Sequence, residues 1–547
     1  MTDAPLAERA ANAYPYPLLI GQLLHRPRAL AQEQEIVYAD VMRYRYRDLL
    51  ARLHRLAHLL RDLGLRPGAT VAMMDWDSHR YLEMFFAVPM MGAVLQTVNV
   101  RLSHEQIVYT LNHAEADVVF VNRVFLPIIA AVAQDLQTVK TLVVLEDGEA
   151  EALPDGFVGE YEALLAASGD RYDFPDLDEN SRATTFYTTG TTGLPKGVHF
   201  SHRQLVLHTL GGLSALAMAP KQGSLHSDDV YMPITPMFHV HAWGLPYIAT
   251  LAGVKQVYPG RYMPDTLLGL KAREGVTFSH CVPTILQMLL SHPKSADVDL
   301  RGWKMIIGGS AMSPGLAEAA KARGIDAFTG YGMSETCPLL SLAQLPETEI
   351  GGPRDTMLRC KTGAPLPLVD LRVVDEEMAD QPHDGATVGE VVARSPWLTQ
   401  SYLKNAEQSE ALWDGGYLHT QDIGHIDERG WLQITDRIKD VIKTGGEWLS
   451  SLTLENLLST HPAVAEVAVI AVKHEKWGER PVALVVKKPG AEVTDTELRR
   501  LLEDAAAEGK ISRFGIIERI EFVEELKKTS VGKLNKRAMR RVYDQAA

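Results

Sequence analysis

A loop rich in glycine and threonine, residues 184–198, constrains this chain more than any other part of its sequence. It reads Thr-Thr-Phe-Tyr-Thr-Thr-Gly-Thr-Thr-Gly-Leu-Pro-Lys-Gly-Val, and its first four residues favour a β-strand. The glycines let the backbone turn tightly and bring N–H groups close to a ligand, while Lys196 adds a mobile positive charge. This combination suits a polyphosphate, although a flexible surface loop can have the same composition. No Gly-Lys-Ser/Thr opens a helix here, so the loop is not a Walker A motif.

Strand and helix signals alternate in the first part of the chain. Leucines from Leu49 to Leu63 recur at three- and four-residue steps, which predicts an amphipathic helix that ends at Gly64. Short apolar runs such as 71–74 and 118–121 are typical of buried strands. The alternation predicts a layered α/β fold with largely parallel sheets. Because 547 residues exceed one ordinary core, we expect two or more domains.

The overall composition excludes several classes of function. A net charge of −14 argues against a general binder of nucleic acid or anionic membranes. The three cysteines (Cys281, Cys337 and Cys360) include no Cys-x-x-Cys pair, which fits a reducing compartment and excludes a disulfide scaffold. The longest apolar stretch, residues 84–98, is interrupted by proline and glycine and is too short to span a bilayer. With no secretory signal visible, we predict a cytoplasmic protein without integral membrane contact.

Two further glycine turns follow predicted strands later in the chain. The strand 304–307 runs into Gly-Gly-Ser-Ala, and the strand 326–329 runs into Gly-Tyr-Gly-Met-Ser-Glu-Thr. Open α/β sheets place their ligands at such strand ends. Tyr331 offers a stacking face for a base, Glu335 offers a hard oxygen ligand for Mg²⁺, and the glycines admit a purine against the backbone.

Two histidines, His239 and His241, lie in the segment Met-Phe-His-Val-His-Ala-Trp-Gly. On an extended run they would point the same way, so a metal site has to be considered. No third ligand cluster accompanies them, and an aromatic–histidine pocket wall is the favoured interpretation.

A charged junction, residues 436–448, contains a Gly-Gly turn and predicts a domain boundary. The tail beyond it alternates strand and helix signals, which indicates a small α+β domain of about a hundred residues. Near its end, Thr-Ser-Val-Gly-Lys places Lys533 on a glycine-containing loop.

These segments together resemble the adenylate-forming superfamily, which contains acyl-CoA synthetases, peptide-synthetase adenylation domains and beetle luciferases. Six motifs occur in the order of that family, and the resemblance extends from roughly residue 15 to the end. Three positions depart from the family pattern: Ser334 stands where threonine is usual, Gln421 replaces the glycine of Thr-Gly-Asp, and Lys528 replaces a proline. The resemblance implies a large N-terminal domain (1–437) of layered α/β sheets with a β-rich subdomain. A small mobile α+β domain (438–547) would follow it.

The resemblance also implies roles for individual residues. The catalytic residues would be Lys533, Lys196, Glu335, His239 and Lys443. The residues expected at ATP or AMP are Thr188, Thr189, Gly190, Thr191, Thr192, Gly193, Gly309, Ser310, Ala311, Gly330, Tyr331, Gly332, Met333, Ser334, Asp422 and Arg437. Thr191 and Glu335 would hold Mg²⁺, and Lys439 would be the hinge. The CoA site and the acyl gate are expected at Trp243, Gly445, Gly446, Glu447 and Trp448.

The activity implied is an AMP-forming acyl-CoA synthetase that uses ATP, Mg²⁺ and coenzyme A. A carboxylic acid and ATP would form an acyl-adenylate and pyrophosphate, and CoA would then give the thioester and AMP. The segments around His239 and Trp448 look most similar to medium- and long-chain fatty acyl-CoA synthetases. A short or thioether acid of the methylmercaptopropionate type is an alternative, as are transfer to a carrier protein or an amine, a luciferase-like oxygenase, and a non-catalytic nucleotide sensor. Some relatives dimerise through the N-terminal region, so a homodimer is expected. No nucleic-acid partner is expected.

Overall fold

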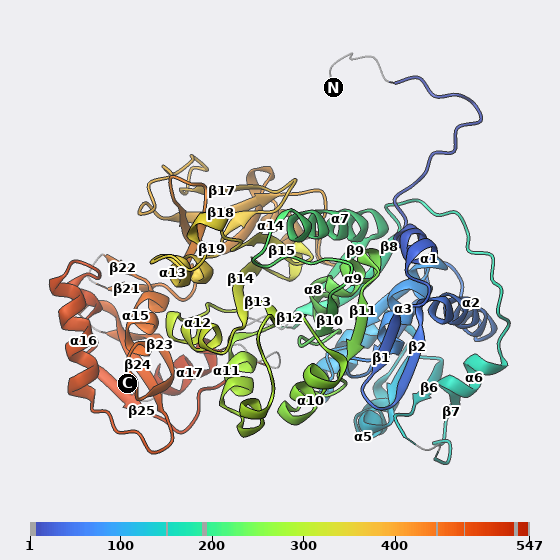
Figure 1. Cartoon of the computed structure of the whole chain (residues 1–547), viewed down its shortest axis with the longest axis horizontal. Coiled ribbons are helices and arrows are strands. Elements are labelled where there is room, and N and C mark those ends of the chain that lie inside the picture. Colours follow the sequence, from blue (N-terminus) through green and yellow to red (C-terminus); the bar gives the residue numbers. More distant parts are fainter. Residues whose placement is uncertain are drawn as a thin grey trace.

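The computed structural model describes residues 7–148, 151–188, 194–444, 447–474, 476–529 and 534–544 (Figure 1). The side chains of Glu447, Trp448 and Asp544 lie outside this description. The strands of the described residues form four sheets.

The first sheet is mixed, with a parallel centre and antiparallel edges. Its strands, in spatial order, are β16 (Ala364–Pro365), β15 (Leu339–Leu342), β14 (Asp326–Gly332), β13 (Lys304–Ile307), β12 (Phe278–Cys281), β10 (Val230–Pro233), β11 (Lys255–Tyr258), β1 (Glu35–Tyr38) and β2 (Met42–Arg45). Strands β1, β11, β10, β12, β13 and β14 are parallel, so the carboxyl ends of β13 and β14 meet at one edge.

The second sheet is parallel except for its last pair. Its strands are β7 (Phe157–Glu160), β6 (Thr141–Leu145), β5 (Ala116–Asn122), β3 (Thr70–Met74), β4 (Val94–Thr97), β8 (Arg182–Thr188) and β9 (Lys196–Ser201). Strands β8 and β9 pair antiparallel, with Thr188 opposite Lys196. The glycine–threonine loop therefore connects two neighbouring strands.

Helices cover these two sheets and connect their strands. They are α1 (His25–Leu30), α2 (Tyr46–Asp62), α3 (His79–Met90), α4 (His104–His113), α5 (Leu126–Val132), α6 (Tyr161–Ala167), α7 (His202–Met218), α8 (Val240–Trp243), α9 (Leu245–Ala252), α10 (Pro264–Glu274), α11 (Pro283–Ser291) and α12 (Pro314–Ala322). The predicted helix 49–63 is confirmed by α2, whose Leu49, Leu53, Leu56 and Leu60 are buried. No helix among the described residues has the length and apolarity needed to cross a membrane.

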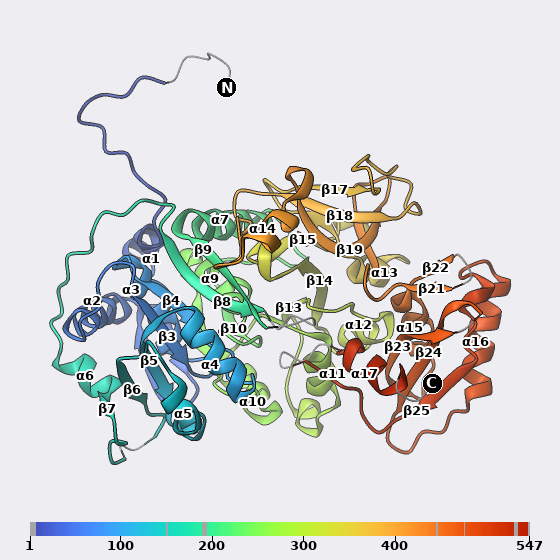
Figure 2. The same cartoon turned by 180° about the vertical axis from the view of Figure 1, so that it is seen from behind.

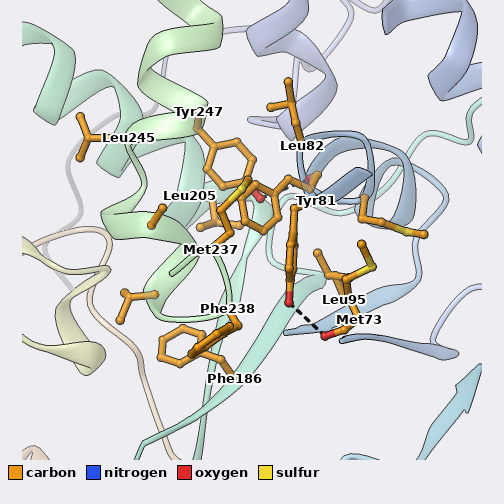
Figure 3. Close-up of a cluster of buried hydrophobic side chains, with 14 of the residues drawn as sticks. Met73, Tyr81, Leu82, Leu95, Phe186, Leu205, Met237, Phe238, Leu245 and Tyr247 are labelled. Atoms are coloured by element: carbon orange, nitrogen blue, oxygen red, sulfur yellow. Dashed lines mark hydrogen bonds between the residues drawn. The ribbon is translucent and has the colours of Figure 1, made fainter. Parts of the chain in front are cut away.

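The main hydrophobic core joins α3, α7 and α9 to the second sheet. Figure 3 shows Tyr81 of α3, whose hydroxyl donates a 3.0 Å hydrogen bond to the carbonyl of Met73. Phe186 of β8 and Phe238, which precedes His239, belong to the same cluster. The core thus anchors both the strand that enters the glycine–threonine loop and the histidine segment.

A third, antiparallel sheet follows, and a small domain completes the chain. The third sheet contains β17 (Asp370–Val374), β18 (Gly389–Arg394), β19 (Leu418–Ile426) and β20 (Leu432–Arg437), with α13 (Asp355–Cys360) and α14 (Ala406–Leu412) around it. The small domain contains β21 (Ile442–Thr444), β22 (Glu447–Leu449), α15 (Ser451–Ser459), β23 (Val464–His474), β24 (Gly478–Lys487), α16 (Asp495–Ala507), β25 (Arg519–Phe522) and α17 (Lys536–Asp544). It lies at one end of the molecule beside α12 and α13 (Figures 1 and 2). The layered α/β fold with a β-rich part and a small α+β domain is confirmed, whereas the boundary at residues 437 and 438 stays a prediction.

Candidate active site

A cavity of about 200 Å³, which we call the nucleotide-sized cavity, lies between the large part of the chain and the small domain. Its walls come from both glycine segments, from the third sheet and from the small domain. The residues that were expected at ATP and that line it are Gly309, Ser310, Ala311, Gly330, Tyr331, Gly332, Asp422 and Arg437. Parallel pairing of β13 with β14 explains why the two glycine segments meet. Met333 and Ser334 continue from this wall towards Glu335 and are not part of the lining.

Asp422 is held in this cavity by two neighbours. The Tyr331 hydroxyl donates to Asp422 Oδ2 at 2.8 Å, and Arg437 Nε donates to Oδ1 at 3.1 Å. Burial raises the pKa of Tyr331, which keeps its hydroxyl protonated as a donor. Gln421, which stands where the family has glycine, adopts a left-handed φ of 58°. The substitution therefore preserves the turn, at some conformational cost, and Asp422 still faces the cavity.

A second group brings together Lys196 and Glu335, which are far apart in sequence. Lys196 Nζ lies 4.5 Å from the centre of the Tyr402 ring, and the Tyr402 hydroxyl donates to Glu335 Oε1 at 2.8 Å. Burial raises the pKa of Glu335, while the Tyr402 hydrogen bond and the Lys196 charge oppose that shift. Lys196 and Glu335 thus share Tyr402 as a neighbour.

A buried carboxylate in this place fits Mg²⁺. Proteins commonly hold Mg²⁺ through one or two carboxylates, with the phosphates of the substrate completing the coordination. Glu335 supplies one such carboxylate, only 7% exposed. The described residues contain no group of three or more His, Cys, Asp or Glu side chains that could hold a metal ion without a substrate.

Several expected site residues lie outside the described residues. They are Thr189, Gly190, Thr191, Thr192, Gly193, Gly445, Gly446 and Lys533, together with the side chains of Glu447 and Trp448. Thr188 ends β8 directly before the first of them. Lys443 lies on β21, where its N–H donates to Glu479 at 2.8 Å, and it lines neither the nucleotide-sized cavity nor the acyl-side cavity described below.

The extended conformation expected for the two histidines is wrong. Residues 240–243 have φ between 48° and 59°, so the backbone forms a left-handed turn and the alternation of an extended strand does not apply. His241 is fully buried among aromatic rings, including Phe186 at 5.3 Å and Phe85 at 5.6 Å between ring centres. Burial lowers its pKa to about 3, and neither of its ring nitrogens has a hydrogen-bond partner among the described residues.

His239 points elsewhere, to a cavity of about 70 Å³ that we call the acyl-side cavity. Its lining is partly apolar and partly polar, and comprises Arg101, Ile234, Thr235, Pro236, His239, Trp243, Tyr262, Val282, Thr284 and Ile285. The Trp243 ring packs against the His280 ring at 5.0 Å. It also lies over Gly308, where a Cβ would come within 3.0 Å of the indole. Because residues 309–311 line the other cavity, Trp243 lies between the two cavities.

A buried carboxyl group, Asp77, supports the acyl-side cavity from behind. Its Oδ2 accepts a 2.7 Å hydrogen bond from the Tyr262 hydroxyl, and its Oδ1 accepts one of 2.8 Å from the Met237 N–H. Burial raises the pKa of Asp77 to about 8, although both hydrogen bonds and the Arg101 charge oppose the shift. The group therefore positions the cavity wall mainly as a neutral acid at physiological pH.

Replacing Asp77 by asparagine should stabilise the protein in a pH-dependent way. Between pH 4 and 8 the folded chain keeps a proton that the unfolded chain has lost, so wild-type stability falls as the pH rises through this window. Asparagine can keep both hydrogen bonds without titrating. We expect a gain of about 1–3 kcal/mol at pH 8.5 and almost none at pH 4.5.

Urea unfolding of Asp77→Asn and wild type at both pH values measures this gain. Asp62→Asn, on the exposed end of α2, is the control. An equal stability change at both pH values would show that the proton on Asp77 is not the cause.

Sequence reasoning missed Tyr402, Asp77 and Tyr262. None of them belongs to a glycine turn, a charged junction or a histidine pair, and each acts through a partner at least 67 residues away. Only the packing of segments that are distant in sequence identifies them.

Comparisons with known proteins match nearly the whole chain. A family model described as "AMP-binding enzyme" matches residues 25–403, and one described as "AMP-binding enzyme C-terminal domain" matches residues 453–533. A long-chain-fatty-acid–CoA ligase of Thermus thermophilus is 41% identical over 97% of this chain and 98% of its own. A 3-methylmercaptopropionyl-CoA ligase of Ruegeria lacuscaerulensis is 36% identical over 97% of this chain and 98% of its own. The crystal structure of ATP-bound MatB from Rhodopseudomonas palustris has a TM-score of 0.82 at 25% identity, covering 97% of this chain and 99% of that one.

Proposed function

The chain belongs to the AMP-binding enzyme family and is an ATP-dependent acyl-CoA ligase, and on this premise we propose that its acid is a medium- or long-chain fatty acid. The observation that carries the chain length is the similarity over nearly the whole chain to ligases of long- and medium-chain fatty acids, and the two neighbouring cavities separated by Trp243 support the activation of an acid by ATP. The larger cavity presents the glycine segments, Asp422 and Arg437 to ATP. The acyl-side cavity presents an apolar wall to the acid.

The first half-reaction brings two anions together, so charge neutralisation and in-line positioning matter more than a base. Asp422 accepts hydrogen bonds from the ribose hydroxyls, and Arg437 lies beside it to bind ribose and phosphate. Lys196 and the threonines of the glycine–threonine loop bind the β- and γ-phosphates. Lys533 bridges the carboxylate and the α-phosphate as charge develops in the transition state.

Mg²⁺, held by Glu335 and the phosphates with Thr191, would neutralise charge on the phosphates when it is bound. The protein contributes the geometry around Glu335. Tyr402 orients its carboxylate by a hydrogen bond, and Lys196 Nζ lies over the Tyr402 ring.

The second half-reaction needs a different arrangement, because the thiol of CoA attacks the adenylate and Lys533 has no further role. The small domain would rotate about Lys439 and present residues 443–448 to CoA. Two features support assigning the present orientation to the first half-reaction. Leu534 and Lys536, which follow Lys533, line the nucleotide-sized cavity, whereas Lys443 does not.

A short or thioether acid is the second candidate, and the acyl-side cavity favours it. At about 70 Å³ this cavity has about one third of the volume of the nucleotide-sized cavity, so it suits a small acyl group better than a long one while Trp243 and its neighbours stay in place. Longer acids therefore require a movement of Trp243.

Replacing Trp243 by alanine should shift the preference towards longer acids. The substitution joins the two cavities and removes the ring that limits the smaller one. We expect the ratio of kcat/KM for palmitate to that for hexanoate to rise about tenfold, since each methylene in a pocket is worth about 1–3 kcal/mol. Trp243→Phe is the matched control and should change the ratio less. An equal loss for all chain lengths would mean that the indole only supports the fold.

Carboxylate-dependent ATP–pyrophosphate exchange without CoA tests the proposed function. The panel contains straight-chain acids from acetate to palmitate together with aryl and thioether acids. Exchange with fatty acids, followed by AMP and thioester when CoA is added, supports the proposal. If exchange occurs but no thioester forms when CoA is added, a carrier protein or an amine is the acceptor. If only the thioether or short acids support exchange, the second candidate is the substrate. No exchange with any acid contradicts the assignment of the acid.

We also propose a cytoplasmic location and a homodimer. The cysteine pattern, without closely spaced pairs, supports a reducing compartment. Light scattering of the purified protein distinguishes a dimer from a monomer.

A further inference from the structure

One carboxylate of the third sheet binds the start of a helix in the small domain. Asp436, in β20, accepts two hydrogen bonds at Oδ2, from Ser451 N–H at 2.5 Å and from the Ser451 hydroxyl at 2.7 Å. Beside it, the Ser450 hydroxyl donates to the carbonyl of Thr435 at 2.5 Å. Asp436 is 6% exposed and Ser451 is fully buried. An anion in this place also interacts favourably with the N-terminal end of the α15 dipole.

Ser451 also contacts Lys536, which lies near Lys533 in sequence. Lys536 Nζ donates to the Ser451 hydroxyl at 2.7 Å and pairs with Glu455 Oε1 at 2.6 Å. Ser451 can accept from Lys536 while it donates to Asp436, so both bonds coexist. Lys536 lies three residues after Lys533 and lines the nucleotide-sized cavity. A continuous chain of polar contacts therefore joins Asp436 of the third sheet, through Ser451, to Lys536.

The expected hinge separates the two ends of this chain of contacts. Asp436 precedes Lys439, whereas Ser451 and Lys536 follow it. The turn between them is closed by bonds from the N–H groups of Asp440 and Val441 to the carbonyl of Arg437, at 2.8 and 2.9 Å. A rotation about Lys439 moves Ser451 and leaves Asp436 in place, so the two can bond in one orientation of the small domain only.

We propose that Asp436 is a positioning residue that holds the small domain in the orientation of the first half-reaction, through Ser451 and Lys536. The inference rests on the proposed two-step function. The bond favours acyl-adenylate formation because it places the segment after Lys533 at the cavity, and it must break before CoA reacts. Weakening it should therefore slow the first half-reaction and leave the second unchanged or faster.

The test uses Ser451→Ala, Asp436→Asn and the double variant. Ser459→Ala is the matched control, since its hydroxyl donates within α15 to the carbonyl of Asn456. Pyrophosphate exchange reports the first half-reaction, and single-turnover thioester formation from a supplied acyl-adenylate reports the second. We expect each single variant to lower exchange about tenfold, as a hydrogen bond to a charged group would. Pyrophosphate exchange by the double variant should be no slower than by the slower of the two single variants. Thioester formation should be at least as fast as in wild type.

Two results would overturn the proposal. Independent, multiplicative losses in the double variant would mean that Asp436 acts on the nucleotide directly, since it also lines the cavity. Equal losses in both half-reactions would mean that the cluster only supports the fold.

Hydrogen exchange of residues 450–459 without substrates separates this proposal from the function on which it rests. Exchange at the start of α15 should be faster in Asp436→Ala than in wild type, whether or not any acid is activated. Unchanged hydrogen exchange at the start of α15 would show that the contact with Asp436 does not determine the orientation of the small domain. Absence of pyrophosphate exchange in the wild-type protein would instead count against the proposed function.

Discussion

Replacing Lys533 by alanine should lower the rate of acyl-adenylate formation by at least about 10³-fold, while thioester formation from a supplied acyl-adenylate stays within about twofold of wild type. The reason is electrostatic. Two anions must approach each other in the first step, and a positioned cation stabilises the charge that develops between them. The second step starts from an adenylate in which that repulsion has already been overcome.

The described residues that flank Lys533 in sequence lie close to one another. The Asn535 N–H donates to the carbonyl of Lys527 at 2.8 Å, and Lys528 pairs with Leu534 across a β-bridge. Leu534 in turn lines the nucleotide-sized cavity. The described residues on the two sides of Lys533 thus pair with each other, and one of them lies at the cavity.

Pyrophosphate exchange and single-turnover thioester formation measure the two steps separately. Lys527→Ala is the control, because this exposed lysine belongs to the same segment. Equal losses in both steps for Lys533→Ala would contradict the assignment of two orientations to the small domain.

Replacing Glu335 by glutamine should lower acyl-adenylate formation by about 10²-fold and raise the Mg²⁺ concentration needed for half-maximal rate. Glutamine keeps the size of the side chain and can still accept the Tyr402 hydrogen bond, but it removes the negative charge. The effect thus isolates the charge from the packing of this buried position.

Titration of pyrophosphate exchange with Mg²⁺ provides the measurement. Tyr402→Phe is the second variant: it removes the hydrogen bond, keeps the carboxylate and should disturb the Mg²⁺ dependence less. Glu377→Gln, on an exposed turn, controls for a general change in charge. A lower rate with an unchanged Mg²⁺ dependence would show that Glu335 supports the site without holding the metal.

Much of the fold could be predicted because its signals are local. The leucine spacing of α2 and the apolar runs of β3 and β5 are properties of neighbouring residues, and the structure confirms each element. The same holds for the glycine segment after β13, whereas the turn predicted at residues 330–332 is wrong: these residues extend β14 and pair with β15. Each segment is continuous in sequence, and the rule that parallel strands end at one edge brings the two together.

The histidine segment shows where local rules fail. Period-two alternation assumes an extended backbone, but four successive residues before Gly244 adopt left-handed angles. Such a conformation is unfavourable for side chains like those of Val240 and Trp243, and no residue pattern predicts it. Burial of His241 in the aromatic core accompanies the turn.

The sequence by itself therefore determined the family, the order of the fold's elements and the glycine segments that line one cavity, because each of these motifs is a short continuous stretch whose chemistry does not depend on distant residues. Only the tertiary structure decided which side chains support those segments. Tyr402 at Glu335, Asp77 behind Tyr262, and Ser451 against Asp436 are pairs brought together by packing between separate elements. The size of the acyl-side cavity was decided in the same way, since its walls come from several strands and loops whose spacing depends on the whole core.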